Sequence, residues 1–507
     1  DLIKKEIVEI FEDGSIKLNM DYFAYTNKLC MINEKFETLF GGPARTDKEE
    51  ITKRIRDIAK SIQVVTEEIV VKMARHAKEI TGADKLCMAG GVALNCVANG
   101  KIVQEKIFSE IWVQPAAGDS GGALGAALAY HYLRGNASPK EEGKCIQKHS
   151  CWGPSFSDDE IKAYLDSFGY KYVKLPQAER NKTLAKYLAE GKIAGHFLGG
   201  VEYGPRALGS RSILGDPRSE STQSSLNLKI KFRESFRPFA PSVLEEEVPK
   251  YFNLHQPSPY MLIVAPVNED RRIKNTDEYK NNLFEIVNQK RSDLPAITHV
   301  DYSARVQSVN KETSPEYYDL INEFKKLTGY GVIINTSFNV NGEPIVCTPK
   351  DAVNCFMATH MDVLFMNNFM LLKEEQTNKN GVSGVRKKAE VPLHKLKAMQ
   401  KAQEDAKSIY NKYFPSLSSF RQEITQRLSG NKQSAWVDFY GGDYFVKGEP
   451  VTAVAPADIT KHWKSLPAEK RKAFHDFLAA ILRLSEKHKL EADDMVHTVS
   501  DSIYVMF

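Results

Sequence analysis

The chain has 507 residues, of which 42% are apolar and 26% charged, a composition typical of globular proteins with about two to four domains. A net charge of +4 is too small to indicate a nucleic-acid or membrane partner, so any anion binding must come from local clusters of cations. The seven cysteines form no CxxC pair and no regular spacing, which argues against a disulfide framework or zinc site and predicts reduced thiols in a cytoplasmic protein. No apolar run approaches the ~20 residues of a membrane span, and the opening at Asp1 is interpreted as that of a fragment or processed chain.

The first part of the chain predicts a hairpin, a long helix and two strand-to-helix units. Asp13-Gly14 marks the turn of the hairpin within residues 6–18. Two buried strands, starting at Lys85 and Ile111, each precede a helix, and this alternation indicates an α/β layered architecture. From about Lys48, apolar residues at three- and four-residue steps predict one amphipathic helix through Ile55, Ile58, Ile62, Val65, Ile69 and Met73.

The rest of the chain divides by composition. Residues 134–150 are polar, as in a linker, and a second α/β or α+β unit is predicted over 151–373, with clear strands at 192–198 and 331–335. Residues 374–392 have few apolar side chains and predict a connector. Residues 393–507 predict a small, mostly helical appendix of unknown role, with one helix over 470–487.

Two strand-to-helix turns carry residues suited to a bound anion or metal. Gly90 and Gly91 follow an apolar strand, where paired glycines let backbone N–H groups approach an anion, although glycines there often serve steric needs alone. Asp119 lies in the second turn among small residues that leave room for a ligand, and its carboxylate suits a divalent metal. The alternative for Asp119 is an ordinary helix N-cap, and spacing alone favours that alternative.

Residues 199–242 hold an excess of arginine and lysine among glycine, proline and apolar residues. A solvated charged face would instead alternate cations with glutamate. Arginines in such rigid surroundings suit a pocket that binds phosphate or carboxylate through paired, charge-assisted hydrogen bonds. Structural ion pairs with Glu202, Asp216 and Glu234 are the alternative, but they would leave cations in excess, so an anion pocket is favoured.

Two polar stretches follow further along the chain. Residues 298–307 alternate polar and apolar side chains and predict a half-exposed strand with His299, Asp301 and Ser303 on one face. Residues 334–345 run from a fully apolar strand into short hydroxyl and amide side chains, which suit the ribose, adenine or phosphates of a nucleotide. An ordinary Asx-rich turn explains this second stretch equally well.

Taken in order, these segments resemble the O-carbamoyltransferases of the nodulation and antibiotic-biosynthesis type over residues 1–373. The resemblance implies an α/β fold in which residues 1–135 form the C-terminal half of an actin/hsp70-like (ASKHA) domain and residues 151–373 a YrdC-like domain. Lys231-Phe-Arg233 matches a Lys-x-Arg signature of YrdC-like domains, and Thr336-Ser-Phe-Asn339 matches a Ser-x-x-Asn-type one. The other matching stretches are Asn19-Met-Asp21-Tyr22-Phe23, Ala89-Gly-Gly-Val-Ala-Leu-Asn95, Pro115-Ala-Ala-Gly-Asp119, Gly204-Pro-Arg-Ala-Leu-Gly-Ser-Arg211, Phe236-Arg-Pro-Phe-Ala-Pro-Ser242 and His299-Val-Asp301.

By this resemblance, the YrdC-like domain binds carbamoyl phosphate and the co-substrate ATP and forms carbamoyl adenylate. The actin-like domain places a divalent metal, iron or magnesium, against the acceptor, a hydroxyl of a small molecule or sugar, with Asp119 as one ligand. Gly90, Gly91 and Asn95 are expected near the adenylate. The residues implied to contact the nucleotide are His299, Asn335, Ser337 and Asn339. The cations implied to hold anionic groups during transfer are Arg206, Arg211, Lys231, Arg233 and Arg237.

The chain departs from the family at the metal site, where members carry a pair of histidines in an H-x-x-x-H arrangement. No such pair occurs among the twelve histidines of this sequence, so half of the actin-like domain is expected to be absent. A chain without that half should form the adenylate but transfer the carbamoyl group poorly, and its uncovered apolar surface should favour aggregation.

Two other functions compete with O-carbamoyl transfer. A tRNA-modifying threonylcarbamoyl enzyme uses the same two fold types, but it needs a basic stripe for tRNA, and the small net charge does not indicate one. A chain that binds a nucleotide or protein partner without turnover is the second competitor. The sequence leaves the acceptor and the metal unidentified, and it leaves open whether two copies associate into a homodimer.

Overall fold

The computed structural model describes residues 1–26, 30–46, 49, 51–134, 147–219, 222–223, 226–227, 230–231, 237–274, 289–340 and 342–376, with scattered positions from 401 onward. The chain divides into two compact units. The first comprises Asp1–Asn19 and Lys48–Arg386, and the second comprises Met20–Asp47 and Lys387–Phe507. The predicted linker at 134–150 and connector at 374–392 lie largely outside the described residues.

The first unit opens with the predicted hairpin and long helix. Strand β1 (Val8–Ile10) pairs antiparallel with β2 (Ile16–Leu18), and the Asp13 side chain accepts the Ser15 N–H at 2.9 Å within the turn. Helix α2 (Lys53–Thr81) confirms the helical periodicity.

The buried face of α2 differs from the predicted stripe. Only Val65 of that stripe is buried, whereas the side chains of Ile62 and Met73 are 49% and 52% exposed. Val70, Val71 and Ala74 supply the rest of the buried face, so the helix is rotated away from the orientation that the largest apolar residues predicted.

The two predicted strand-to-helix units form a parallel pair. Strand β3 (Lys85–Met88) lies beside β4 (Glu110–Val113), and α3 (Cys96–Gln104) is the crossover helix between them. Helix α4 (Gly121–Ala129) follows β4, and η4 (Tyr130–Arg134) follows α4. The edge of β4 is closed by one side chain, because Gln256 both accepts the Ile111 N–H at 3.0 Å and donates to the Ile111 carbonyl at 2.9 Å.

A nine-stranded mixed sheet dominates the described part of the first unit. Its order is β5-β13-β12-β6-β7-β11-β8-β10-β9, and only the β12–β6 and β10–β8 pairs are parallel. The interior strand β11 is antiparallel to both neighbours, with Asn335 opposite Leu214 on one side and Ala240 on the other. The strands are β5 (Val173–Lys174), β6 (Ala194–Phe197), β7 (Arg211–Gly215), β8 (Ala240–Leu244), β9 (Ile263–Pro266), β10 (Ser303–Val309), β11 (Val332–Ser337), β12 (Val363–Met366) and β13 (Phe369–Leu372).

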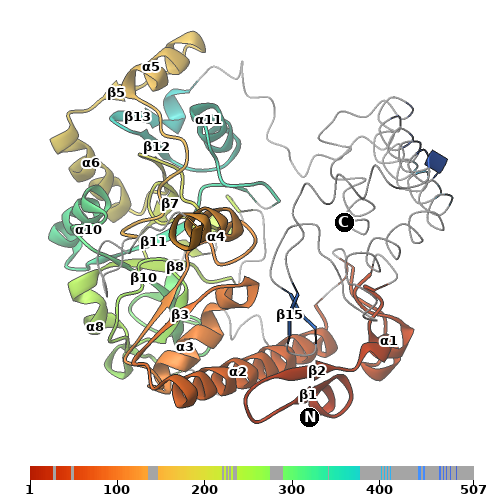
Figure 1. Ribbon diagram of the computed structural model, residues 1–507. Coiled ribbons are helices and arrows are strands. Elements are labelled where there is room, and N and C mark those ends of the chain that lie inside the picture. Colours follow the sequence, from red (N-terminus) through yellow and green to blue (C-terminus); the bar gives the residue numbers. More distant parts are fainter. Residues whose placement is uncertain are drawn as a thin grey trace. The chain divides into compact units, whose positions relative to one another are not determined.

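Helices cover both faces of this sheet. Helices α6 (Gln177–Ala189) and α10 (Pro315–Thr328) lie side by side on one face, as Figure 1 shows. Their apolar residues form one core with alternate strand residues such as Leu214, Leu244 and Ile333. The other face packs α5 (Asp158–Ser167) and α11 (Pro349–Ala358), and its core continues into residues of α2, α3 and β4. The short helix α8 (Val248–Tyr251) follows β8.

The second unit is described at fewer positions. Helix α1 (Glu34–Leu39) starts at Asn33, whose side chain accepts the N–H groups of Lys35 and Phe36. In the predicted appendix, described positions within 468–487 are helical, in agreement with the expected helix, and Lys472 pairs with Asp476 one turn away. The hairpin of β14 (Tyr444–Val446) and β15 (Glu449–Val451) was not predicted. None of the described helices in either unit is long and apolar enough to cross a membrane.

Candidate functional site

A buried lysine, Lys231, lies at the end of strand β11 and is surrounded by oxygen atoms. The Lys231 side chain, from a residue only 3% exposed, donates to the carbonyl and hydroxyl of Ser337 and to both the carbonyl and the side-chain oxygen of Asn339. The two Asn339 contacts measure 2.9 and 2.7 Å. Residues more than one hundred positions apart, taken from the two signature motifs, therefore meet.

The local geometry of this cluster follows from how β11 ends. Beyond Ser337 the chain stays beside β7, because the Phe338 N–H donates to the Arg211 carbonyl at 2.9 Å. The Asn339 side chain then turns the chain back by donating to the Glu343 carbonyl at 2.7 Å, and it accepts the Ser337 hydroxyl at 2.8 Å. A buried ammonium is costly unless several acceptors surround it, so Lys231 requires oxygen atoms close to its Nζ.

A buried thiol lies near the same lysine. Burial raises the pKa of Cys355 to about 12, and the neighbouring Lys231 charge only partly opposes that effect. The thiol therefore stays protonated near neutral pH, and a nucleophilic role for Cys355 does not fit its surroundings.

Arg206 is a second cation to consider. Unlike Lys231, it has no protein partner in the described part of the chain. Its residue is half-buried, its Nε is buried with no hydrogen-bond acceptor, and burial lowers the pKa of the guanidinium. The side chain lies near Cys96, the first residue of α3. An arginine placed in this way has donors left for a bound anion.

Arg211, by contrast, is engaged by the protein itself. It is fully buried and donates to the carbonyls of Leu198, Ser210 and Pro154 at 3.2–3.3 Å, while its guanidinium lies 3.5 Å from the centre of the Phe197 ring. Burial lowers the pKa of Arg211 to about 10. Through these contacts, Arg211 supports the loop before β7.

Ion pairing within the protein, the alternative for the basic stretch, explains two residues that follow β7 at its end away from Ser337. Asp216 and Arg218 form a two-pronged ion pair with a closest distance of 2.6 Å. Arg237 is exposed, and its carbonyl accepts the Asn227 side chain at 2.7 Å. Arg233 lies outside the described residues, so its place relative to Lys231 stays a prediction.

The segment around His299 corrects the predicted strand over residues 298–307. Strand β10 begins only at Ser303, because the chain turns at Tyr302, whose φ is +60°. The observed strand is almost wholly buried, since it lies between β8 and β9 inside the sheet. His299 is half-buried in the turn, and burial is the main cause that lowers its pKa; Arg305 and Arg291 lower it further and Asp301 opposes them.

Asn335, predicted to contact a nucleotide, lies in the core of the sheet. It is fully buried, and its side-chain N–H group donates to the Ala207 carbonyl at 3.1 Å and to Gln307 at 2.8 Å. The Asn335 side chain lies beneath the loop that carries Arg206 and does not contact Lys231. Its role is therefore to hold that loop through the Ala207 carbonyl.

The glycine turn and the aspartate turn lie beside each other. Gly90 donates its N–H to the Ala117 carbonyl at 2.8 Å and has a φ of +98°, a conformation open to glycine. A side chain at Gly90 or Gly91 would meet open space. Asn95 is the N-cap of α3: its side chain accepts the Ala98 N–H and also exchanges hydrogen bonds with Gln63.

Asp119 is exposed and does not cap α4, whose N-cap is Ser120 without a side-chain cap bond. The described residues contain no group of three or more His, Cys, Asp or Glu side chains that could hold a metal ion. One exposed carboxylate is too few donors for a divalent metal site. The residues that the structure describes around Asp119 therefore do not fit the predicted metal.

Comparison with known proteins places these residues in a family. Residues 1–128 match the carbamoyltransferase N-terminus and residues 185–373 match the carbamoyltransferase C-terminus. The chain belongs to the carbamoyltransferase family. Gly90, Gly91, Asn95 and Asp119 fall in the N-terminal match, and the Lys231 cluster and Arg206 fall in the C-terminal match.

Several curated proteins are similar over much of the chain. An uncharacterized protein of Synechocystis, sll1178, is 51% identical over 74% of this chain and 62% of its own length. Nodulation protein NolNO of Sinorhizobium fredii is 40% identical over 64% of this chain and 45% of its own length. Nodulation protein NolO of Bradyrhizobium diazoefficiens is 39% identical, with corresponding shares of 64% and 55%. The chain thus spans about half the length of these carbamoyltransferase relatives.

A solved structure of full-length HypF in the phosphate- and nucleotide-bound form overlaps 50% of this chain and 28% of its own. The TM-score of 0.24 and sequence identity of 19% are too low for that overlap to inform the fold.

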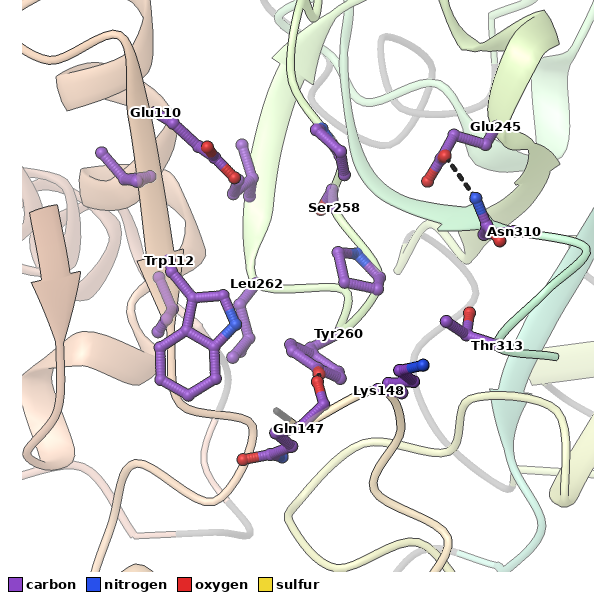
Figure 2. Close-up of a pocket in the computed structure, with 15 residues that line it drawn as sticks. Glu110, Trp112, Gln147, Lys148, Glu245, Ser258, Tyr260, Leu262, Asn310 and Thr313 are labelled. Atoms are coloured by element: carbon purple, nitrogen blue, oxygen red, sulfur yellow. Dashed lines mark hydrogen bonds between the residues drawn. The ribbon is translucent and has the colours of Figure 1, made fainter. Parts of the chain in front are cut away.

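The first unit also has a cavity of about 270 Å³ away from the predicted site (Figure 2). Trp112 and Tyr260 meet edge to face on one side, with ring centres 6.3 Å apart, and Glu245 accepts the Asn310 side chain at 2.7 Å on the other. Gln147, Lys148 and Thr313 are also part of the lining. None of the predicted site residues is among those that line it.

Sequence reasoning missed residues that hold the site from beneath. Glu202 is predicted only as an ion-pair partner, yet its carboxylate accepts the Leu208 N–H in the loop that carries Arg206, and the His196 ring contacts the same loop at the Gly209 carbonyl. Gln307 was read as part of a half-exposed strand but is only 3% exposed. The available signal was Glu202 itself, a carboxylate inside a Gly- and Pro-rich loop.

Proposed function

We propose that this carbamoyltransferase forms a carbamoyl adenylate and passes the carbamoyl group to a hydroxyl of a small molecule or sugar. In the first half-reaction, carbamoyl phosphate, ATP and water give carbamoyl adenylate, phosphate and pyrophosphate. In the second, the acceptor oxygen attacks the carbamoyl carbon, the bond to the AMP phosphate oxygen breaks, and the acceptor proton is lost to solvent.

The observation that carries this proposal is the meeting of Lys231 with Ser337 and Asn339. Both substrates of the first half-reaction are anionic, and a buried ammonium can exchange the side-chain oxygens of Ser337 and Asn339 for phosphoryl or carbamate oxygens. The charge that builds up during phosphoryl and carbamoyl transfer is stabilised most strongly by a fixed cation in a site of low dielectric constant. Arg206 adds a guanidinium whose fork matches a phosphate group.

Support for a hydroxyl acceptor is more general. The relatives named nodulation proteins are about 40% identical to this chain over 64% of its length. The small net charge of +4 offers little for a long phosphate backbone, which disfavours a tRNA acceptor.

The test is carbamoyl-phosphate-dependent exchange of radiolabelled pyrophosphate into ATP, which reports the first half-reaction alone. We expect exchange by the unaltered chain and a loss of at least about 100-fold in Lys231→Met, which removes the cation but keeps the length of the side chain. Lys250→Met is the matched control, since Lys250 is an exposed lysine paired with Glu247. Arg233→Ala tests the second residue of the Lys-x-Arg motif in the same assay.

Ser337→Ala provides a milder change should Lys231→Met fail to fold, and it should weaken exchange by about tenfold. Well-folded protein without any exchange would reject adenylate formation and leave nucleotide or partner binding without turnover. Retention of tRNA that weakens steeply with salt would instead favour the tRNA-modifying alternative.

A further inference from the structure

The loop between Tyr203 and β7 is held by side chains at many of its backbone groups. On its amide side, one oxygen of the buried Glu202 carboxylate accepts the N–H groups of Leu208, Ser210 and Arg211 at 2.7, 2.8 and 3.2 Å. The Gly209 N–H donates to the Ser212 hydroxyl at 3.0 Å. Four consecutive amides are therefore fixed without a helix or a strand.

The carbonyl side of the same loop is held equally closely. The carbonyls of Ala207, Leu208 and Gly209 accept hydrogen bonds from three buried side chains. The donors are Asn335 Nδ2 at 3.1 Å, Gln307 Nε2 at 2.9 Å and His196 Nδ1 at 2.6 Å, respectively. The loop (Gly204–Arg211) thus rests on residues of β6, β10 and β11, three strands of the large sheet.

These donors belong to one buried polar network. Gln307 Oε1 accepts Asn335 Nδ2 at 2.8 Å and the Ser242 hydroxyl at 2.5 Å, and the Tyr317 hydroxyl donates to Ser242 at 2.9 Å. All four side chains are at most 5% exposed. Buried amides without partners are costly, so each member strongly constrains the others and, through them, the loop.

Gly209 fits the loop onto this network. Its φ is +120°, and a Cβ at this position would lie 2.6 Å from the Tyr317 ring. Only glycine satisfies both conditions without a shift of the loop. The backbone at 209 is therefore pressed directly against the network.

Arg206 belongs to this rigid loop and is half-buried. Its guanidinium has no hydrogen bond or ion pair within the described part of the chain, and it lies near Cys96 at the start of α3. The loop also reaches the other family segment, since the Tyr203 hydroxyl donates to the Ser120 carbonyl and a Cβ at Gly204 would lie 2.6 Å from the Pro115 carbonyl oxygen. Arg206 is thus presented where the two carbamoyltransferase segments meet.

We propose that Gln307 and Asn335 are positioning residues that hold Arg206 against the phosphoryl group of the adenylate at this junction. This inference rests on the proposed function and deepens it, because it separates two cations by task. Lys231 acts where the adenylate forms. Arg206 holds the AMP phosphate beside the glycine turn and the aspartate turn. A rigid loop matters because a guanidinium binds phosphate through two parallel bonds, whose geometry a small displacement destroys.

The test uses AMP as the probe and measures its dissociation constant by calorimetry on the full chain. Arg206→Ala should weaken AMP binding by about tenfold or more, the loss expected for a charge-assisted pair of hydrogen bonds. Gln307→Met keeps the side-chain length but removes the donor to the Leu208 carbonyl, and it should give a similar loss. Gln177→Met, at an exposed glutamine of α6, should leave the affinity unchanged.

The double variant distinguishes positioning from general damage to the fold. If Gln307 acts only through Arg206, the losses in Arg206→Ala and Gln307→Met will not add in the double variant. Additive losses, or an unchanged affinity in Gln307→Met, would overturn the positioning role. Unchanged affinity in Arg206→Ala would overturn the assignment of the phosphate to this loop.

A milder variant covers the case in which Gln307→Met does not fold. Tyr317→Phe removes only the outermost hydroxyl of the network, and it should weaken AMP binding by about twofold. No change in Tyr317→Phe would count against the network. Absence of pyrophosphate exchange with normal, Arg206-dependent AMP binding would reject the proposed first half-reaction but retain the loop as a nucleotide site, so the two failures are distinguishable.

Discussion

His196 in β6 should make the stability of the protein depend on acid in a defined range. It is fully buried, stacks on Tyr317 and donates its Nδ1–H to the Gly209 carbonyl, and burial, with help from Arg180 and Arg211, lowers its pKa from 6.5 to about 4. The unfolded chain therefore binds a proton between these values that the folded chain does not, so stability is lost as pH falls below about 6.5. Between pH 7.5 and 5, His196 should account for a loss of about 2 kcal/mol in the free energy of unfolding.

Urea denaturation at the two pH values checks this, with His196→Gln as the comparison. Glutamine keeps a donor for the Gly209 carbonyl but cannot titrate, so its loss of stability between pH 7.5 and 5 should be smaller by that amount. Equal pH dependence in both proteins would show that His196 is protonated or exposed in solution.

At the scale of single residues, the sequence located the buried cation but not the residues that support it. Lys231 could be singled out because it lies in a Lys-x-Arg motif, and Ser337 and Asn339 because short polar residues follow an apolar strand. Asn335, two residues earlier, has the same composition and neighbours, yet its side chain is directed into the core. Asn335 and Ser337 lie on the same face of β11, because side chains alternate between faces along a strand. What separates them is which elements pack over each, and those elements come from segments far apart in sequence.

At the scale of elements, the contact of α3 with β9 should depend on a single small residue. Gly100 lies in the middle of α3, and a Cβ there would collide with the backbone carbonyl of Val264 in β9. Gly100→Ala should therefore destabilise the protein by about 2 kcal/mol, because a backbone atom cannot move aside cheaply. Gly122→Ala in α4 is the matched control: its Cβ meets open space, and the better helix propensity of alanine should stabilise by up to about 1 kcal/mol.

Thermal and urea unfolding of both variants measure the expected loss of stability in Gly100→Ala and the expected gain in Gly122→Ala. A stable Gly100→Ala protein would mean that α3 does not pack on β9 in solution.

The Gly100 contact could not have been predicted from the sequence, because a glycine inside a helical pattern indicates only a weaker helix. The start of β10 was equally hidden, since the alternation at 298–302 continues smoothly into the strand while the backbone turns at Tyr302.

At the scale of the whole molecule, the α/β architecture of the first unit followed from the alternation of strands and helices. The order of the nine strands did not, because six of the eight neighbouring pairs are antiparallel and join strands whose sequence patterns are alike. The buried polar network was also beyond sequence, since Ser242, Gln307 and Tyr317 come from three separate elements. Pairwise contacts of this kind are properties of the assembled core.

Helix α4 gives the final prediction, because it is apolar and yet none of its side chains is buried. Leu128 is 44% exposed, and Tyr130 immediately after the helix is 73% exposed. Apolar surface of this kind promotes association between molecules, so Leu128→Lys should reduce concentration-dependent association and the binding of an apolar fluorescent dye. Its free energy of unfolding should change by no more than about 0.5 kcal/mol, because no packed contact is lost.

Sedimentation velocity over a range of concentrations, together with urea unfolding, measures both effects. Leu165→Lys in α5 is the control, since Leu165 is fully buried and a lysine there should cost several kcal/mol, on the order of the penalty for a buried unpaired charge. If Leu128→Lys destabilised the chain as strongly as Leu165→Lys, α4 would have to be packed against other residues in solution. A stable Leu128→Lys protein that associates as before would show that another apolar surface drives the association. The exposed α2 residues Ile62 and Met73 would be the next to change.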